Sequence, residues 1–396
     1  MRSWPARRSA ADRRLLVLAG LLAVAAAVQH WYSIADGIRV QFAHDASSYV
    51  VIARAAPSLP STPILQPFAE RIPVHWAVGV VSNAGVSLDL VYRLAMFACL
   101  LGIVLTVHRT LVEIGLDLRE YALAIAVLVA SAYPFHYYLA APGMLSDAVL
   151  VLGVSILLLG FTRDRLWIVL LGLAVGTAGR QTMVPVALVA AAWAFRAHAW
   201  REVRWRAAAA CLALPVGIYV ALNLAARGFG YPNPGGWHDL SVLGFLTGTE
   251  AFVLHLGRVT LGVLVPAGLV IGAWLRTRNP LPRGALLVAI AVAAQPLVLG
   301  PSSNGGNEPR LAGLAAPALA VAAGALLRNA HLSRRETLVA LGAIVVAGLH
   351  SRYTHGPLLR NYVWATAEVV AAIVLGAVVG RLGPAAARRR GREWQT

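Results

Sequence analysis

Long apolar runs with very few charged residues recur along the whole chain, and they constrain its fold more than any other feature. A transmembrane helix needs about 20 predominantly apolar residues to cross the hydrocarbon core of a bilayer. The runs therefore predict an all-α, polytopic transmembrane bundle of about 12 helices in a single domain, residues 1–396. The predicted spans are 14–34, 88–108, 120–138, 147–162, 165–179, 182–196, 207–226, 251–275, 284–301, 311–327, 336–350 and 362–381. Arg180-Gln181 interrupts one long run, so 165–179 and 182–196 are either two spans or one broken span.

The composition excludes a soluble domain and a nucleic-acid-binding protein. Hydrophobic residues make up 59% of the chain and charged residues 13%, whereas a soluble domain carries about 25% charged residues. The net charge of +17 comes from 34 basic residues, all of them arginine, which cluster between the apolar runs. With the N-terminus inside, 24 arginines fall on the cytoplasmic side and 8 on the outer side. This positive-inside bias predicts that both termini are cytoplasmic and that residues 382–396 form a basic cytoplasmic tail.

The outer loops carry the polar chemistry. The longest of them, 35–87, holds five prolines from Pro57 to Pro73 and is expected to pack on the membrane as short interfacial helices, 46–56 and 74–86, around an extended segment. Polar groups at membrane depth are costly unless they line a wet cavity, so we expect one cavity open to the periplasm of a bacterial inner membrane. Its candidate residues are His44, Asp45, Glu70, Arg71, His136, Tyr138, Asp147, Arg180, Gln181 and Arg310.

No HExxH zinc site, GxSxG elbow or P-loop occurs in the sequence. The pattern instead resembles the GT-C superfamily of polytopic glycosyltransferases, which take sugars from polyprenyl-phosphate donors. In that superfamily an essential Asp lies in the long loop after the first helix, and a second acidic residue commonly lies in the next outer loop. Asp45 and Asp147 match these two positions, and Arg180 and Arg310 match the expectation of phosphate-binding arginines. The resemblance covers residues 14–200, and 207–381 add further transmembrane helices.

The resemblance implies an inverting membrane glycosyltransferase with a polyprenyl-phosphate-linked sugar donor and a glycan or lipid acceptor. Asp45 would be the general base, and Arg180 and Arg310 would stabilise the leaving phosphate. Asp147, His136 and Tyr138 would bind sugar hydroxyls or orient the base, and His44, Glu70, Arg71 and Gln181 complete the expected substrate site. Asp147 has no adjacent carboxylate, so the sequence defines no metal-ligand motif and leaves the use of a divalent metal open.

Simpler structural roles exist for the same residues. Asp45 and Asp147 are suited to helix N-caps, Glu70-Arg71 to an ion pair, and Arg310 to anchoring a helix end. A twelve-helix transporter or flippase is the alternative function, although carriers usually place polar residues near the membrane midplane, and this sequence offers only Arg93, Arg258 and Glu368 there. A non-catalytic partner in polymer export is a further alternative.

Overall fold

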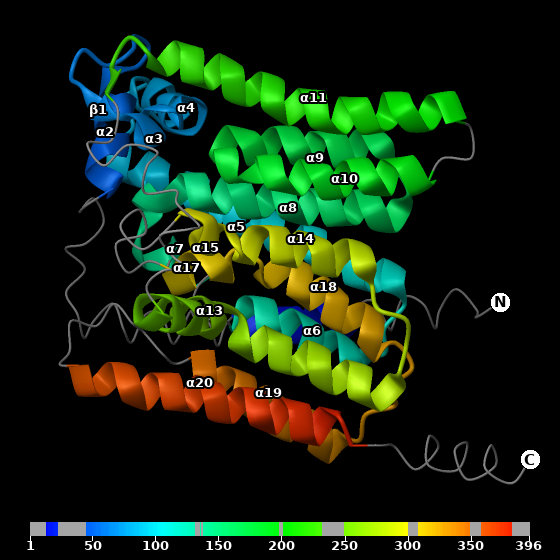
Figure 1. Cartoon of the computed structure of the whole chain (residues 1–396). Helices are drawn as coiled ribbons and strands as arrows, with labels where there is room; N and C mark the ends of the chain where they lie inside the picture. The colour runs from blue at the N-terminus through cyan, green and yellow to red at the C-terminus, as the bar shows by residue number, and fades with distance from the viewer. Residues whose placement is uncertain are drawn as a thin grey trace, which may run out of the picture.

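The computed structural model describes residues 13–22, 45–130, 135, 138–197, 201–231, 249–299, 308–348 and 358–381. Within these ranges the chain is almost entirely helical, and the long helices pack side by side in one bundle (Figure 1). Among the described residues, four stretches are long and apolar enough to cross a membrane: Leu88–Ile114, Pro142–Arg163, Arg204–Ala226 and His255–Thr277. The prediction of an all-α membrane bundle is confirmed at this level. His44, His136, the loop start 35–44 and the tail 382–396 lie outside the described residues.

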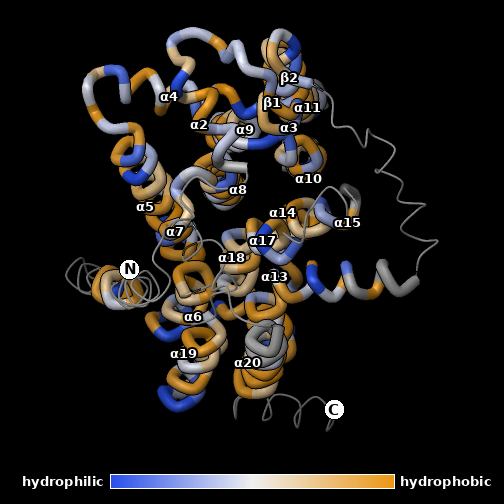
Figure 2. The backbone as a smooth tube through the Cα atoms, turned by 90° about the vertical axis from the view of Figure 1, so that its left-hand side faces the viewer, coloured by the Kyte–Doolittle hydropathy of each residue, from blue (hydrophilic) through white to orange (hydrophobic). Residues whose placement is uncertain are grey.

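The centre of the bundle is α18 (Ala316–Leu327), which is buried along almost its whole length and contacts α5, α6, α8, α13 and α14. Hydrophobic residues make up most of the described helices (Figure 2). Residues 13–22 form a helix, and the other long helices are α5 (Leu88–Ile114), α6 (Leu118–Val129), α8 (Leu145–Arg163), α9 (Leu166–Gly179), α10 (Val184–Ala197), α11 (Arg201–Ala226), α13 (Thr249–Thr277), α14 (Arg283–Ala293), α19 (Arg334–Gly348) and α20 (Leu358–Val379).

The short elements gather at one end of the bundle, on the left in Figure 1, which we call the α4 end. They are α2 (Asp45–Ala55), α3 (Gln66–Ala69), α4 (Ile72–Ser82), α7 (Tyr138–Ala140), α15 (Gln295–Leu299), α17 (Glu308–Gly313) and the 3-10 turns η2 (Pro142–Met144) and η3 (Gln181–Met183). At the opposite end, Arg14 donates a hydrogen bond to the carbonyl of Leu116, and Arg276 donates one to the carbonyl of Val379. The start of the first described helix and the end of α20 therefore lie at the same end.

Several predicted spans are shorter or divided in the structure, always near the α4 end. The expected span 120–138 ends as α6 at Val129, and 284–301 divides into α14 and α15. The expected span 311–327 divides into α17 and α18. Pro296 and Pro317 occupy the first turn after each division, where the missing N–H costs nothing, whereas within a continuous helix it would remove a hydrogen bond. Residues 165–179 and 182–196 form two separate helices, α9 and α10. The rings of Phe161 and Trp193 stack 4.9 Å apart, so the C-terminal ends of α8 and α10 lie together.

Residues 45–82 pack on the bundle as short helices, and not as a separate domain. The two-residue strands β1 (Ile64–Leu65) and β2 (Gly230–Tyr231) pair in parallel, so this segment is tied to the end of α11. A small apolar cluster supports the pairing: Ile52, Ile64, Ala69, Ile72, Ala226 and Phe229.

Candidate functional site

Close packing of α8 against α9 creates the centre of the site. A methyl group on Gly153 would lie 2.3 Å from the backbone nitrogen of Gly176, and one on Gly179 would lie 2.6 Å from the carbonyl oxygen of Ser146. Only glycine permits this approach, as at other helix contacts in membranes. Because Ser146 and Gly179 are in contact, the next residue of each segment, Asp147 and Arg180, is brought to the same place.

Asp147 is held between arginines from two other parts of the chain. Its side chain is 1% exposed, and its Oδ1 accepts a hydrogen bond from Nη1 of Arg180, the residue between α9 and η3. Nε of Arg310, on α17, lies 3.8 Å from Oδ2. Asp147 lies in the first turn of α8, whose N-cap residue is Met144, so the capping role considered from sequence does not describe it.

A third buried arginine, Arg71, precedes α4. Its guanidinium carbon lies 5.5 Å from the ring centroids of both Tyr49 and Phe68, which stabilises the cation through the ring faces. Arg71 and Asp147 both act electrostatically on His75, so the three groups belong to one neighbourhood. Arg71, Arg180 and Arg310 together place three positive charges around the one negative charge of Asp147, all of them buried.

His75, in the short helix α4, links this cluster to α2, α5 and α8. Its ring stacks on Tyr49 at 4.1 Å, its Nδ1 lies 2.9 Å from the Tyr92 hydroxyl and its Nε2 lies 2.6 Å from Oγ of Ser146. Burial, and then the charge of Arg71, lower the pKa of His75 to about 3, so the ring is neutral. Tyr92 donates to the Tyr49 carbonyl, and it therefore accepts from Nδ1–H, while Ser146 donates to Nε2.

Glu70 fixes the neighbouring segment to α11. Its Oε1 accepts hydrogen bonds from Asn223 at 2.8 Å and from Gln66 at 3.3 Å. Burial raises the pKa of Glu70, and the two amide hydrogen bonds lower it in part. Glu70 thus serves to join α3 to α11, at the place where β1 also meets β2.

Several buried polar atoms near Asp147 make no hydrogen bond in the structure: Oδ2 of Asp147, Nε of Arg180, Oε1 of Gln181 and Oγ1 of Thr182. Buried polar atoms are nearly always paired, so a group of unpaired ones indicates a place for a polar ligand or water. Three buried guanidinium groups lie here, and guanidinium groups bind anions, so an anion is the ligand that these side chains favour. The same charges oppose a divalent cation at Asp147, and among the described residues no three His, Cys, Asp or Glu side chains converge.

The structure brings together four of the residues predicted from sequence, Arg71, Asp147, Arg180 and Arg310, with Gln181 following directly. Asp45 is the first residue of α2, four positions before Tyr49, and this spacing is about 6 Å along a helix. Tyr138 is buried on α7, and Glu70 is turned to α11. His44 and His136 lie outside the described residues.

Sequence reasoning missed several members of the site. Tyr49, His75, Tyr92 and Ser146 are not among the predicted residues, because they lie in mainly apolar segments. A second buried pair was also missed: Nδ1 of His255 lies 3.0 Å from Oε1 of Glu308, on the same short helix as Arg310. The sequence signal that could have found His75 was a lone histidine inside the otherwise apolar segment Ile72–Ser82.

Comparison of the chain with protein-family models, with curated proteins and with solved structures gave no match. Function is therefore inferred from the residues of the site.

Proposed function

We propose that the chain is an integral membrane glycosyltransferase that moves a sugar from a polyprenyl-phosphate donor to a glycan or lipid acceptor. The observation that carries the proposal is the buried cluster of Arg71, Arg180 and Arg310 around Asp147, in which Oδ2 of Asp147 and Nε of Arg180 make no hydrogen bond. The resemblance to the GT-C superfamily in residues 14–200 adds the reaction class.

The phosphate of the donor would lie against the arginines. Guanidinium groups form paired, charge-assisted hydrogen bonds with phosphate oxygens. As the sugar departs, the phosphate gains negative charge, which the same groups stabilise more strongly than in the ground state. Asp147 holds Arg180 in position and reduces the repulsion between the arginines.

In this proposal about twelve helices cross the membrane, and the α4 end faces the periplasm because most arginines fall at the opposite end. The divided helices near the α4 end are typical of membrane proteins that bind polar ligands within the bilayer. The lipid tail of the donor would lie between helices, and its phosphate would reach the arginines from the side.

Asp45 is proposed as the general base that removes the proton of the acceptor hydroxyl. It begins α2, about one helical turn from Tyr49, which contacts both His75 and Arg71. Asp147 is less suited to this role because Arg180 and Arg310 already stabilise its negative charge. For inversion, Asp45 would act on the face of the sugar opposite the leaving phosphate.

Purified protein in proteoliposomes, given undecaprenyl-phosphate-linked glucose, galactose, mannose and arabinose with membrane lipid acceptors, tests the proposal. We expect transfer with at least one donor, and a 10²- to 10⁴-fold lower turnover for Asp45→Asn with unchanged donor affinity. The matched control is Asp89→Asn, an exposed carboxylate paired with Arg93. Near wild-type transfer by Asp45→Asn would remove the base, and donor translocation without any transfer would favour the flippase alternative.

A further inference from the structure

The short helix α17 carries Arg310 on one face and a buried carboxylate, Glu308, on the other. Residues two apart in an α-helix point about 200° apart around its axis. Nε of Arg310 lies 3.8 Å from Oδ2 of Asp147 on α8, whereas Oε1 of Glu308 lies 3.0 Å from Nδ1 of His255 on α13. The helix accordingly lies between α8 and α13 (Figure 2). The side chains of Glu308 and His255 are 1% and 2% exposed, and their contact fixes the second face of α17.

The hydrogen bonds of His255 require a shared proton between its ring and Glu308. Nε2 lies 2.9 Å from the carbonyl oxygen of Pro296, which can only accept, so Nε2 carries a proton. With Nε2 protonated, a neutral imidazole offers only an acceptor at Nδ1, and a carboxylate is an acceptor too. One proton must therefore lie between Nδ1 and Oε1. Arg258 also approaches Oε1, but at 3.7 Å and with a side chain 46% exposed, so the bond to His255 is the stronger contact.

The other ring nitrogen of His255 leads back to the arginine cluster by a second route. Pro296 belongs to α15, and the preceding residue, Gln295, donates a hydrogen bond from Nε2 to the carbonyl of Thr182 at 2.5 Å. Thr182 lies in η3, the turn that directly follows Arg180. His255 is thus bonded to the helix that carries Arg310 and, through α15, to the turn beside Arg180.

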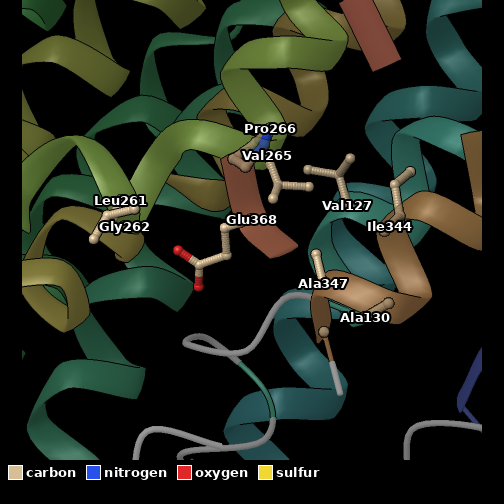
Figure 3. Close-up of a pocket in the computed structure, with 10 residues that line it drawn as sticks. Val127, Ala130, Leu261, Gly262, Val265, Pro266, Ile344, Ala347 and Glu368 are labelled. Atoms are coloured by element: carbon tan, nitrogen blue, oxygen red, sulfur yellow. The ribbon is translucent and has the colours of Figure 1, made fainter. Parts of the chain in front are cut away.

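The backbone of α13 touches α17 next to Glu308. A methyl group on Gly262 would lie 2.2 Å from the carbonyl oxygen of Pro309, so glycine permits the close approach. Beyond this contact, Gly262 and Pro266 border a small cavity, lined mainly by apolar side chains, between α6, α13, α19 and α20 (Figure 3). Apolar packing is non-directional, whereas a hydrogen bond has a preferred direction. The contact of His255 with Glu308 is therefore suited to set the rotation of α17 about its axis.

We propose that His255 and Glu308 are positioning residues for the phosphate site: they fix the rotation of α17 and so direct Arg310 toward Asp147 and the phosphate of the donor. Groups that bind a ligand need neighbouring residues that hold their geometry. The pair acts through Arg310 and contacts no ligand itself. This inference rests on the phosphate binding in the proposed function, and not on sugar transfer.

The affinity of the full-length protein for undecaprenyl phosphate, measured by native mass spectrometry, tests the role of Glu308. Glu308→Ala removes the hydrogen bond and should weaken binding about tenfold. Glu308→Gln should bind as the wild type does, because its amide can donate to Nδ1 of His255. The matched control is Glu336→Ala, which breaks an ion pair with Arg276 at the opposite end and should leave the affinity unchanged. Melting temperatures show that each variant is folded.

A double-variant comparison separates positioning from a general loss of structure. In an Arg310→Gln background, Glu308→Ala should change the affinity by less than about twofold, because its effect passes through Arg310. In an Arg180→Gln background it should keep its full effect. His255→Gln retains a donor for the Pro296 carbonyl but loses the contact with Glu308, and it should behave as Glu308→Ala does. It provides the same test if Glu308→Ala does not fold.

Wild-type affinity of Glu308→Ala and His255→Gln would overturn the inference. So would an equal loss in the Arg310→Gln and Arg180→Gln backgrounds, or a loss in Glu308→Gln as large as in Glu308→Ala. Absence of undecaprenyl-phosphate binding by the wild type would contradict the phosphate site and this inference with it. Binding with the expected pattern but without sugar transfer would instead leave the positioning pair in place and overturn only the glycosyltransferase proposal.

Discussion

Removing the charge of Asp147 should destabilise the protein more than removing its hydrogen-bond partner Arg180. Asp147→Asn removes the carboxylate charge that Arg180 and Arg310 contact, and breaking a buried ion pair in this way costs about 3–5 kcal/mol. Arg180→Gln leaves Asp147 beside Arg310 at 3.8 Å, an attraction of about 4 kcal/mol at an effective dielectric constant near 20. It also lowers the repulsion between the arginines, so we expect a smaller cost of about 1–3 kcal/mol.

The assay is reversible unfolding by sodium dodecyl sulfate in mixed micelles, followed by tryptophan fluorescence in phosphate-free buffer. The double variant should be less destabilised than the sum of the two single variants, with a coupling of about 0.5–3 kcal/mol. Asp89→Asn breaks an exposed i,i+4 pair and should cost less than about 0.5 kcal/mol. If Asp147→Asn costs no more than this control, or less than Arg180→Gln, the arginine cluster does not depend on Asp147 as we describe.

Three further predictions concern the residues that support the site. His75 is neutral in the folded protein, with a pKa of about 3, below the usual 6.5. Its contribution to the free energy of unfolding should therefore be complete above pH 6.5 and fall by up to about 1.4 kcal/mol per pH unit below it. In His75→Gln this part of the pH dependence should be absent from the measured free energies of unfolding. Gly179→Ala should separate α9 from α8 and lower both melting temperature and phosphate affinity, whereas Gly217→Ala, with open space around it, should do neither. Arg276 bonds the carbonyls of Ala330, His331, Val379 and Arg381 at the opposite end, so Arg276→Met should cost about 3 kcal/mol in the unfolding assay with no change in ligand affinity.

The sequence was sufficient to predict elements that depend on local composition. The helices expected at 46–56 and 74–86 lie at Asp45–Ala55 and Ile72–Ser82, because prolines and apolar runs set their limits. The break at Arg180 followed from placing a charge within a 30-residue apolar stretch. These signals come from neighbours along the chain.

Features that depend on distant partners were not predictable in the same way. The pairing of Ile64 with Gly230 joins segments far apart in sequence, and neither two-residue strand has a pattern of its own. The contact of His255 with Glu308 requires knowing which faces of α13 and α17 meet. The close approach of Gly153 to Gly176 appears in sequence only as small residues at helical spacing, which also occur where no helix packs.

The most direct test of the account is the affinity of the purified protein for undecaprenyl phosphate, measured by native mass spectrometry on the wild type, Arg310→Gln and Arg93→Gln. Arg310 belongs to the buried cluster, whereas Arg93 is an exposed arginine paired with Asp89. We predict saturable binding that Arg310→Gln weakens at least tenfold and Arg93→Gln leaves unchanged. Equal binding by all three proteins, or no binding by the wild type, would contradict a phosphate site at the arginine cluster.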